Sequence, residues 1–221
     1  MKSICCIILT FISTFLFGQN RESAIISDND SIEIVRSGKG IEFDSLSFIN
    51  KNEIFYVEDS EEKWLKVILS KFNSSGQIIG FIHSSKIQKI NECSLNKKAE
   101  ILNLLYAKIT SNIKDSLADL ETELLYYSYC ELTEKYFCEA GDINILKGFF
   151  KLRVSIFQAL EIPSSVVVSC FSCKPELVLK TLKSIRIGLE YLISDIISFT
   201  PDNIENYEEL MIEIKALEKD N

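Results

Sequence analysis

The sequence has few of the residues on which common enzyme mechanisms depend. It contains one histidine, His83, and its 8 glycines form no glycine-rich phosphate-binding loop. This scarcity argues against most hydrolases, kinases and dinucleotide-binding enzymes. The carboxylate pairs Glu121 with Glu123 and Glu208 with Glu209 lie in charged helical stretches, where solvent exposure is the default, although the sequence leaves a glycosidase-like acid pair open. We therefore predict a protein that is not an enzyme and needs no cofactor.

Positive charge is also scarce, with 24 Lys and Arg against 32 Asp and Glu and a formal net charge of -8. Such a chain is a poor binder of phosphate backbones, so no nucleic-acid partner is predicted. The 47% of hydrophobic and 25% of charged residues are typical of a globular protein. At 221 residues the chain suits one or two domains and can bury a core without metal or disulfide help.

No apolar run reaches the roughly 20 residues of a membrane-spanning helix. The N-terminus has Lys2, an apolar run from Ile4 to Phe17, and polar residues from Gly18 onward. This pattern predicts a secretory signal peptide over residues 1–18 and a soluble, periplasmic or secreted chain after cleavage. The alternatives are a buried first strand or an uncleaved anchor. Cys5 and Cys6 stand at the start of the run, which argues against a lipid anchor.

The odd number of cysteines leaves at least one of them unpaired within the chain. Five follow the predicted signal peptide, namely Cys93, Cys130, Cys138, Cys170 and Cys173. The C-x-x-C spacing of Cys170 and Cys173 allows a disulfide, a redox pair or half of a zinc site. No second C-x-x-C exists and the single histidine lies elsewhere, so the prediction is no metal. Cys130 and Cys138 are about 12 Å apart along a predicted helix and cannot bond to each other there.

Short segments with strand character begin near residue 31. Ile32 and Ile34 alternate with Glu33, as in a half-buried strand. Asn50–Asn52 is a predicted tight turn, because asparagine adopts the left-handed conformation readily. The further predicted strands are Phe43–Ile49, Glu53–Glu58, Trp64–Ser70 and Gln77–His83. Closely spaced strands without an intervening helix predict a small closed or sandwich-like antiparallel sheet.

Four short segments carry a resemblance to a known family. They are Val35–Gly38, the turn Asn50–Glu53, the strand Trp64–Val67 and the closing segment Gly80–Ser85. In this order and spacing they resemble the bacterial Src-homology-3 (SH3) domain over residues 31–90. The resemblance implies a five-stranded barrel that binds peptides or cell-wall material, or docks another domain, without catalysis.

Two positions depart from the family pattern. Asn52 stands where glycine is usual, and the loop from Ser70 to Gln77 is longer than in compact members. These departures affect the expected geometry of one edge of the barrel.

Three residues of this segment are candidate ligand-binding residues, namely Tyr56, Trp64 and His83. Aromatic side chains provide a large contact area for a peptide or a sugar at low entropic cost. The alternative interpretation is that Trp64 and Phe81 serve only in core or edge packing of a small domain. For His83 the alternative is that Ser84-Ser85 hold it by hydrogen bonds alone.

From residue 94 onward the apolar period changes to that of helices. Leu102, Leu105 and Ile109 belong to the first predicted helix. The second has apolar positions Ile113, Leu117, Leu120, Leu124, Leu125, Tyr129, Leu132 and Tyr136. Gly141-Asp142 is predicted to end it and to cap a third helix, which stops before Pro163. The segment Ser164–Cys173 is predicted as either a short helix or a buried strand.

The most regular apolar stripe lies between Pro175 and Pro201. Its positions are Val178, Leu182, Ile185, Leu189, Leu192, Ile196 and Phe199, which predict one long helix beginning at Pro175. Such a stripe suits an intramolecular antiparallel bundle, or alternatively a dimerising coiled coil; additional flanking apolar residues favour the bundle. After Pro201, Asp202 with Glu205 forms a predicted capping box before a final helix carrying Tyr207, Leu210, Ile214 and Leu217.

The predicted fold class is α+β, an SH3-like barrel at residues 31–90 followed by an antiparallel helical bundle at residues 94–221. The predicted function is an exported, non-enzymatic binding protein. The barrel engages a peptide or cell-envelope component, and the bundle contacts a partner protein. One alternative is a periplasmic inhibitor or immunity-type protein that blocks an enzyme, suggested by charge and compartment. The other is a thiol redox protein that uses Cys170 and Cys173.

Overall fold

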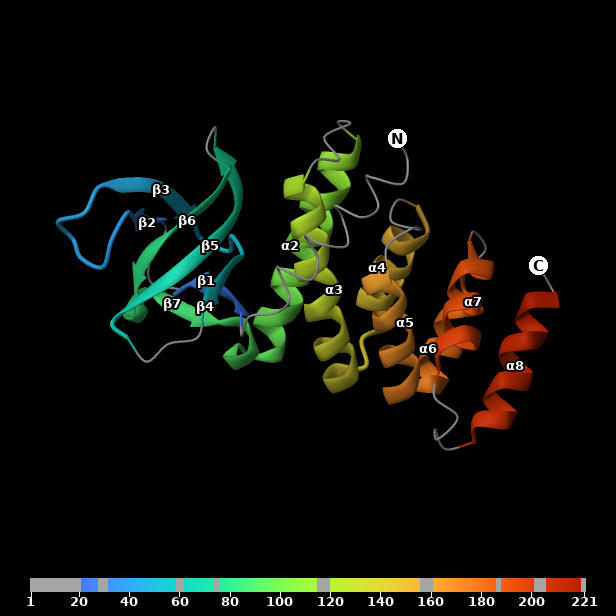
Figure 1. The fold of residues 1–221 in the computed structure, drawn as a ribbon. Coiled ribbons are helices and arrows are strands. Elements are labelled where there is room, and N and C mark those ends of the chain that lie inside the picture. Colours follow the sequence, from blue (N-terminus) through green and yellow to red (C-terminus); the bar gives the residue numbers. More distant parts are fainter. Residues whose placement is uncertain are drawn as a thin grey trace. The chain divides into compact units, whose positions relative to one another are not determined.

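The computed structural model describes residues 21–27, 32–58, 62–73, 76–114, 120–155, 161–185, 188–200 and 206–219. The chain divides into two compact units, Met1–Cys93 and Ser94–Asn221 (Figure 1). The described part of the first unit consists of strands with two 3-10 turns, and that of the second consists of helices. The predicted α+β class is therefore confirmed. The predicted signal peptide, residues 1–18, lies outside the described residues.

The β unit contains one antiparallel sheet in the order β3-β2-β6-β5-β4-β1-β7. Its strands are β1 (Arg21–Ile26), β2 (Ile32–Arg36), β3 (Ser45–Asn50), β4 (Phe55–Glu58), β5 (Trp64–Asn73), β6 (Gly76–His83) and β7 (Ile87–Lys89). The 3-10 turns η1 (Ser84–Lys86) and η2 (Ile90–Glu92) flank β7. Strands β2 to β6 were predicted, whereas β1 and β7 were not. The described sheet therefore has seven strands instead of the five of the prediction.

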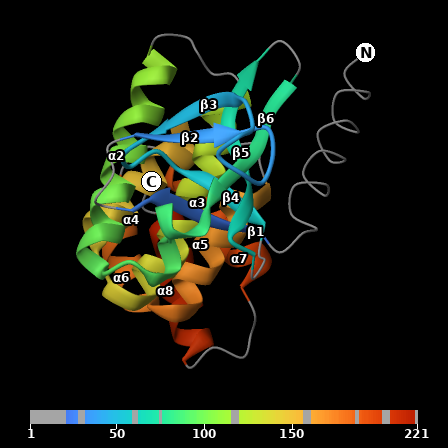
Figure 2. The same ribbon diagram turned by 90° about the vertical axis from the view of Figure 1, so that its left-hand side faces the viewer.

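A single apolar core joins the seven strands. Alternate residues point to it, such as Phe55 and Val57 on β4, as the two-residue period of a strand requires. Ile49 on edge strand β3 is fully buried in this core, and Ile87 on the opposite edge strand β7 packs against it. A flat sheet could not bring both edges to one core, so this sheet is curled (Figure 2). Among the described strands no pairing joins β3 to β7, and the sheet stays open.

One predicted turn of the sheet is confirmed, and one predicted loop is not. Asn52 has a φ of 65° in the turn between β3 and β4, as predicted. The predicted long loop from Ser70 to Gln77 is wrong, because β5 continues to Asn73 and β6 begins at Gly76, whose φ is 116°. The pairing of β5 with β6 is irregular between Ile68 and Phe72, and this irregularity allows the long strand to bend.

Charged side chains cover part of the β3 edge. The Asn50 backbone N–H donates to the Glu53 carboxylate at 3.1 Å, and the Lys71 ammonium donates to the Phe48 carbonyl at 3.2 Å. Glu53 and Lys71 also form an ion pair of 2.7 Å. An exposed edge strand is prone to pair with other chains, and charged side chains are a common protection.

The helical unit is arranged in two layers. Its helices are α2 (Leu95–Lys114), α3 (Leu120–Ala140), α4 (Ile143–Ser155), α5 (Glu161–Cys173), α6 (Pro175–Leu182), α7 (Leu189–Phe199) and α8 (Tyr207–Lys219). Helix α4 packs against α2 and α6 in one layer, and α5 packs against α3 and α7 in the other. Helix α8 packs against α7 at the end of the series, and Figure 1 shows the helices side by side in chain order.

Several helix boundaries differ from the prediction. Ile113 belongs to α2 and not to the second helix, which the structure describes as α3 from Leu120 to Ala140. The third helix, α4, ends before Pro163 as predicted, but Pro163 itself lies in the first turn of α5, where the missing N–H of proline costs no hydrogen bond. The segment Ser164–Cys173 is helical, which decides between the two structures considered for it.

The predicted single helix from Pro175 to Phe199 is wrong. Pro175 does begin a helix, but α6 ends at Leu182 and α7 starts at Leu189. Gly188 precedes α7 with a φ of 69°, a left-handed conformation that glycine adopts at little cost. A Cβ atom at this position would lie 1.8 Å from the side chain of Val154 on α4. The apolar stripe is therefore divided between two helices. Helix α6 buries Val178 and Leu182, and α7 buries Leu189, Leu192 and Ile196.

Two predicted helix ends are confirmed. Gly141 has a φ of 70° after α3, and the Asp142 carboxylate accepts the Asn144 backbone N–H at 2.8 Å at the start of α4. The final helix, α8, buries Leu210 and Ile214 as expected. The predicted capping box of Asp202 and Glu205 lies outside the described residues. No helix in the described ranges is both long and apolar enough to cross a membrane.

Candidate functional site

Two of the three predicted ligand-binding residues lie together on the outer face of the sheet. Trp64 on β5 is directly opposite His83 on β6. Their rings meet edge to face, with centroids 5.4 Å apart. Both side chains are half-buried, while their neighbours Leu65 and Ile82 point into the core. Trp64 is therefore not a core residue, and its ring is held by an aromatic contact.

His83 also has a structural role. Its Nδ1 accepts a hydrogen bond from the Ser85 backbone N–H at 3.3 Å and lies 2.8 Å from the Ser85 hydroxyl. His83 thereby caps the 3-10 turn η1. The expected hydrogen bonding by Ser84-Ser85 thus involves Ser85, and it orients the imidazole ring against Trp64.

Phe81 extends this face by one step along β6. It lies two residues before His83, on the same side of the strand, and is opposite Lys66 on β5. In an antiparallel sheet such diagonal neighbours are about 7–8 Å apart, within reach of aromatic side chains. Trp64, Phe81 and His83 therefore form one row, which we call the aromatic surface.

A positively charged side chain from a loop covers Phe81. The Lys39 ammonium lies 5.9 Å from the Phe81 ring centroid and pairs with the Glu62 carboxylate. Lys39 comes from the loop between β2 and β3, and Glu62 comes from the segment just before β5. A cation at this distance from a ring face is attracted by the ring quadrupole.

The loop that carries Lys39 packs against Phe43 and is closed by two hydrogen bonds. Gly38 is buried, and a Cβ atom there would lie 2.4 Å from the ring of Phe43. The Arg36 guanidinium donates to the Phe43 carbonyl at 3.0 Å, and Ser37 N–H donates to the Asp44 carbonyl at 2.9 Å. The Arg-Ser-Gly segment therefore closes the base of the loop, and Lys39, the next residue, lies over Phe81.

The third candidate, Tyr56, lies elsewhere on the sheet. It is opposite Ile68 on β5, four residues from Trp64. At about 3.3 Å per residue this offset is roughly 13 Å along the strand. The structure thus brings Trp64 and His83 together, and leaves Tyr56 outside the aromatic surface.

Sequence patterns did not identify Lys39 and Glu62 as part of this surface. Phe81 was considered only as packing, although its place two residues before His83 in a strand put it on the same face. For Lys39 and Glu62 no local signal exists, because they come from separate segments and meet only in the folded sheet.

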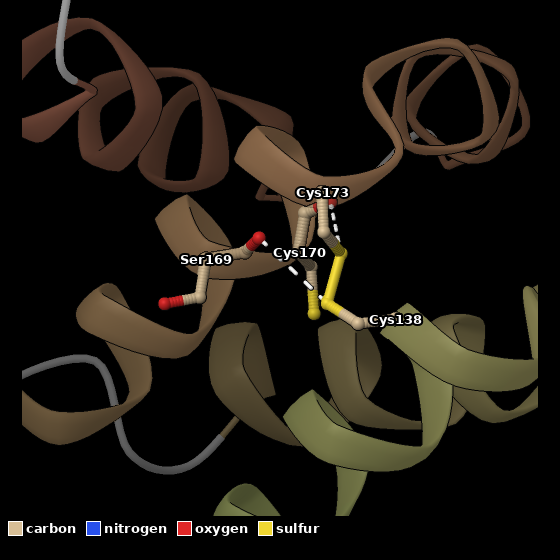
Figure 3. The surroundings of a disulfide bond; sticks show 4 residues. All are labelled: Cys138, Ser169, Cys170 and Cys173. Carbon is tan, nitrogen blue, oxygen red and sulfur yellow. Dashed lines mark hydrogen bonds between the residues drawn. A yellow bond between two sulfur atoms is a disulfide. The ribbon is translucent and has the colours of Figure 1, made fainter. Parts of the chain in front are cut away.

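The two C-x-x-C cysteines do not form a pair. Cys173 is bonded to Cys138 on α3, with Cα atoms 5.7 Å apart, and Cys170 is a buried free thiol (Figure 3). Burial raises the pKa of the Cys170 thiol to about 12, so almost none of it is thiolate near neutral pH. This disulfide rules out a bond between Cys170 and Cys173, one of the arrangements that their spacing allowed. The reason is that Cys173 ends α5 beside α3, whereas Cys170 points into the core.

The helical unit also contains a buried ion pair. Arg153 on α4 donates two hydrogen bonds of 3.3 Å to the carboxylate of Asp195 on α7, and both side chains are less than 10% exposed. The Arg153 guanidinium also donates to the Ser164 hydroxyl of α5 at 2.9 Å. A pair of this kind joins three helices and is better suited to fixing their packing than to binding a ligand.

Within the described ranges no group of three or more His, Cys, Asp and Glu side chains is arranged to hold a metal ion. Comparison of the chain with protein-family models, with characterised proteins and with solved structures gives no match.

Proposed function

We propose that this chain is an exported, non-enzymatic binding protein whose β unit is an SH3-like barrel. In this proposal the barrel holds an extended peptide or a cell-envelope component, and the helices, an antiparallel bundle built in two layers, contact a partner protein. Two features support the barrel. Strands β2 to β6 are the five strands of the resemblance, and residues of both edge strands share one core.

The aromatic surface is the observation that favours ligand binding. A small domain gains stability by burying its large side chains, yet Trp64, Phe81 and His83 are half-buried on the outer face of a sheet with a separate apolar core. Ring edges and faces of this kind provide contact area with few rotatable bonds, which lowers the entropic cost of binding. The Lys39–Glu62 ion pair beside them adds charges that can give specificity.

The chain has its own reporter for this proposal. Trp64 is the only tryptophan, so intrinsic fluorescence reports directly on the aromatic surface. We expect soluble peptidoglycan fragments or members of an extended-peptide library to change this fluorescence in a saturable way. Binding measured by calorimetry should fall at least about tenfold in Trp64→Ala, equal to about 1.4 kcal/mol.

The matched control is Phe72→Ala. Phe72 is an aromatic residue of the same strand, 39% exposed and eight positions from Trp64. Its replacement should leave binding unchanged. Equal losses of binding affinity in folded Trp64→Ala and Phe72→Ala proteins would contradict the proposal. It would also be contradicted if neither the peptidoglycan fragments nor the peptide library contained a ligand.

A second candidate is an inhibitor of a basic enzyme, favoured by the net charge of -8. This candidate predicts a stoichiometric complex with a basic envelope enzyme that survives Trp64→Ala and weakens steeply with salt. Recovery of no enzyme from an envelope extract, together with ligand binding that depends on Trp64, would decide for the first candidate.

A further inference from the structure

The positive charge beside the aromatic surface is a side chain of the protein itself, Lys39. The Lys39 ammonium lies between two groups that attract it, the Glu62 carboxylate and the face of the Phe81 ring. The three residues come from the β2–β3 loop, the segment before β5, and β6. A carboxylate beside an aromatic face is a suitable environment for an ammonium or guanidinium group.

Both sides of this arrangement are fixed by the fold. Gly38, directly before Lys39, is covered by the ring of Phe43. On the other side, the Ser84 backbone N–H donates to the Lys63 carbonyl at 2.7 Å, which anchors the residue next to Glu62 to the end of β6. The backbone beside Glu62 and the strand that carries Phe81 would therefore keep their places if the Lys39 side chain moved away.

Lys39 is nevertheless easy to displace. The side chains of Lys39 and Glu62 are 50% and 54% exposed, so the pair is accessible to solvent and to another cation. Exposed ion pairs contribute little, because water and salt screen them and because two long side chains lose rotational freedom.

We propose that Glu62 and Phe81 form a subsite for a lysine or arginine side chain of an extended peptide, and that Lys39 is an internal occupant which this side chain displaces. The inference rests on the proposed function and names the chemical class of its ligand. Trp64, diagonal to Phe81, would contact the neighbouring part of the peptide. The net charge of -8 favours the approach of a basic segment.

An internal occupant lowers the apparent affinity of the subsite, since only molecules with Lys39 displaced can bind. Replacing it should therefore strengthen binding. In Lys39→Ala we expect the probe Nα-acetyl-lysine methylamide to bind about 5- to 10-fold more tightly than in the unaltered protein. Binding is followed by the NMR shifts of the Phe81 and Glu62 resonances and by Trp64 fluorescence.

Two further variants separate this effect from general electrostatics. Lys63→Ala removes the same charge next to Glu62 but not the side chain over Phe81, and should leave the affinity for the probe near that of the unaltered protein. Lys39→Ala combined with Glu62→Gln should lose the gain. The matching probe Nα-acetyl-norleucine methylamide, which lacks the charge, should bind no better to Lys39→Ala than to the unaltered protein.

The inference is overturned if Lys39→Ala binds the lysine probe no more tightly than Lys63→Ala does. It is also overturned if the gain survives Glu62→Gln. The proposed function is tested separately by the loss of peptide or envelope-fragment binding in Trp64→Ala. That loss, combined with equal behaviour of Lys39→Ala and Lys63→Ala, would refute the cation subsite and leave the binding surface in place.

Discussion

In the β unit the core is apolar and the ion pairs lie around it, whereas the helical unit carries charged side chains inside its own packing. The Lys39–Glu62 pair has half of each side chain exposed, and the Arg153–Asp195 pair has 5% and 9%. Ser70 is the one buried polar residue among the described positions of the β unit. The helical unit buries several, namely Lys98, Thr122, Ser128, Thr133, Arg153, Thr181, Asp195 and Thr200.

This contrast indicates where substitutions should be tolerated. Surface pairs in the β unit can be altered to test binding with little effect on folding. Removing one partner of a buried pair leaves a charge without compensation, which is costly. Two signals distinguish the units, because Trp64 fluorescence reports on the β unit and helical circular dichroism reports mainly on the other.

The largest effect is expected for Asp195→Asn. This change leaves the Arg153 guanidinium buried without a counter-charge, and should lower the free energy of unfolding by about 3–5 kcal/mol. Urea unfolding followed by circular dichroism measures it. The double variant Arg153→Met, Asp195→Leu is the control and should lose far less, because no charge stays buried. A loss below about 1 kcal/mol for Asp195→Asn would show that this buried pair contributes no more to stability than an exposed pair of the β unit.

The second-largest effect is expected when the Cys138–Cys173 disulfide is removed. The bond closes a sequence separation of 35 residues, and the chain-entropy relation gives a stabilisation of about 3–4 kcal/mol for such a loop. We expect a reductant to lower the thermal midpoint of the helical signal. The variant Cys138→Ser, Cys173→Ser should start from the lower midpoint and no longer respond to the reductant. If reduction leaves the midpoint of the unaltered protein in place, the disulfide does not stabilise the fold.

The third effect is expected at alkaline pH, which should lower the free energy of unfolding of the helical unit. Burial raises the pKa of Cys170 from 9.0 to about 12 and raises that of Cys130 further still. The unfolded chain releases these protons at lower pH than the folded chain does. The stabilisation is therefore complete below about pH 9 and is lost as pH rises toward about 12, by up to about 1.4 kcal/mol per pH unit and thiol.

Urea unfolding at about pH 8 and about pH 10 measures this loss. Cys170→Ala should show a smaller decline between the two conditions, because one of the two buried thiols is absent. The same decline in Cys170→Ala and in the unaltered protein would show that this thiol does not control it.

The smallest effect is expected at the sheet edge. Lys71→Ala removes the side chain that bonds the Phe48 carbonyl and pairs with Glu53. We expect the free energy of unfolding, measured by Trp64 fluorescence, to fall by about 0.5–1 kcal/mol. Self-association, measured by light scattering, should increase because β3 becomes less protected. Lys66→Ala is the control, because Lys66 pairs with Glu58 on the inner strands. Greater association in Lys66→Ala than in Lys71→Ala would contradict this role of the edge.

The sequence predicted the β strands better than the helix boundaries, for a physical reason. Strands β2 to β6 show local alternation and are separated by turn formers such as Asn52 and Gly76. The apolar stripe from Val178 to Phe199 keeps its period through the turn at Gly188, so periodicity alone could not reveal the break. The close packing of Gly188 on Val154 is a tertiary contact that no local pattern encodes.

The candidate site was predictable only in part for the same reason. Trp64 and His83 face each other because two predicted strands form one hairpin, so their proximity follows from pairing. The position of Lys39 depends on loop geometry and on residues from two other segments. Likewise, the bond of Cys173 to Cys138 depends on how α3 and α5 pack, which cysteine spacing does not determine.

The disulfide has a further consequence for the helical unit under mechanical force. Helix α8 packs against α7 at the end of the series, so a pull on the C-terminus should peel the helices off in order from that end. Between Cys138 and Cys173 the covalent bond would stop this unravelling. About 120 Å of chain, 35 residues at about 3.3–3.6 Å each, would stay hidden from extension until the bond is reduced.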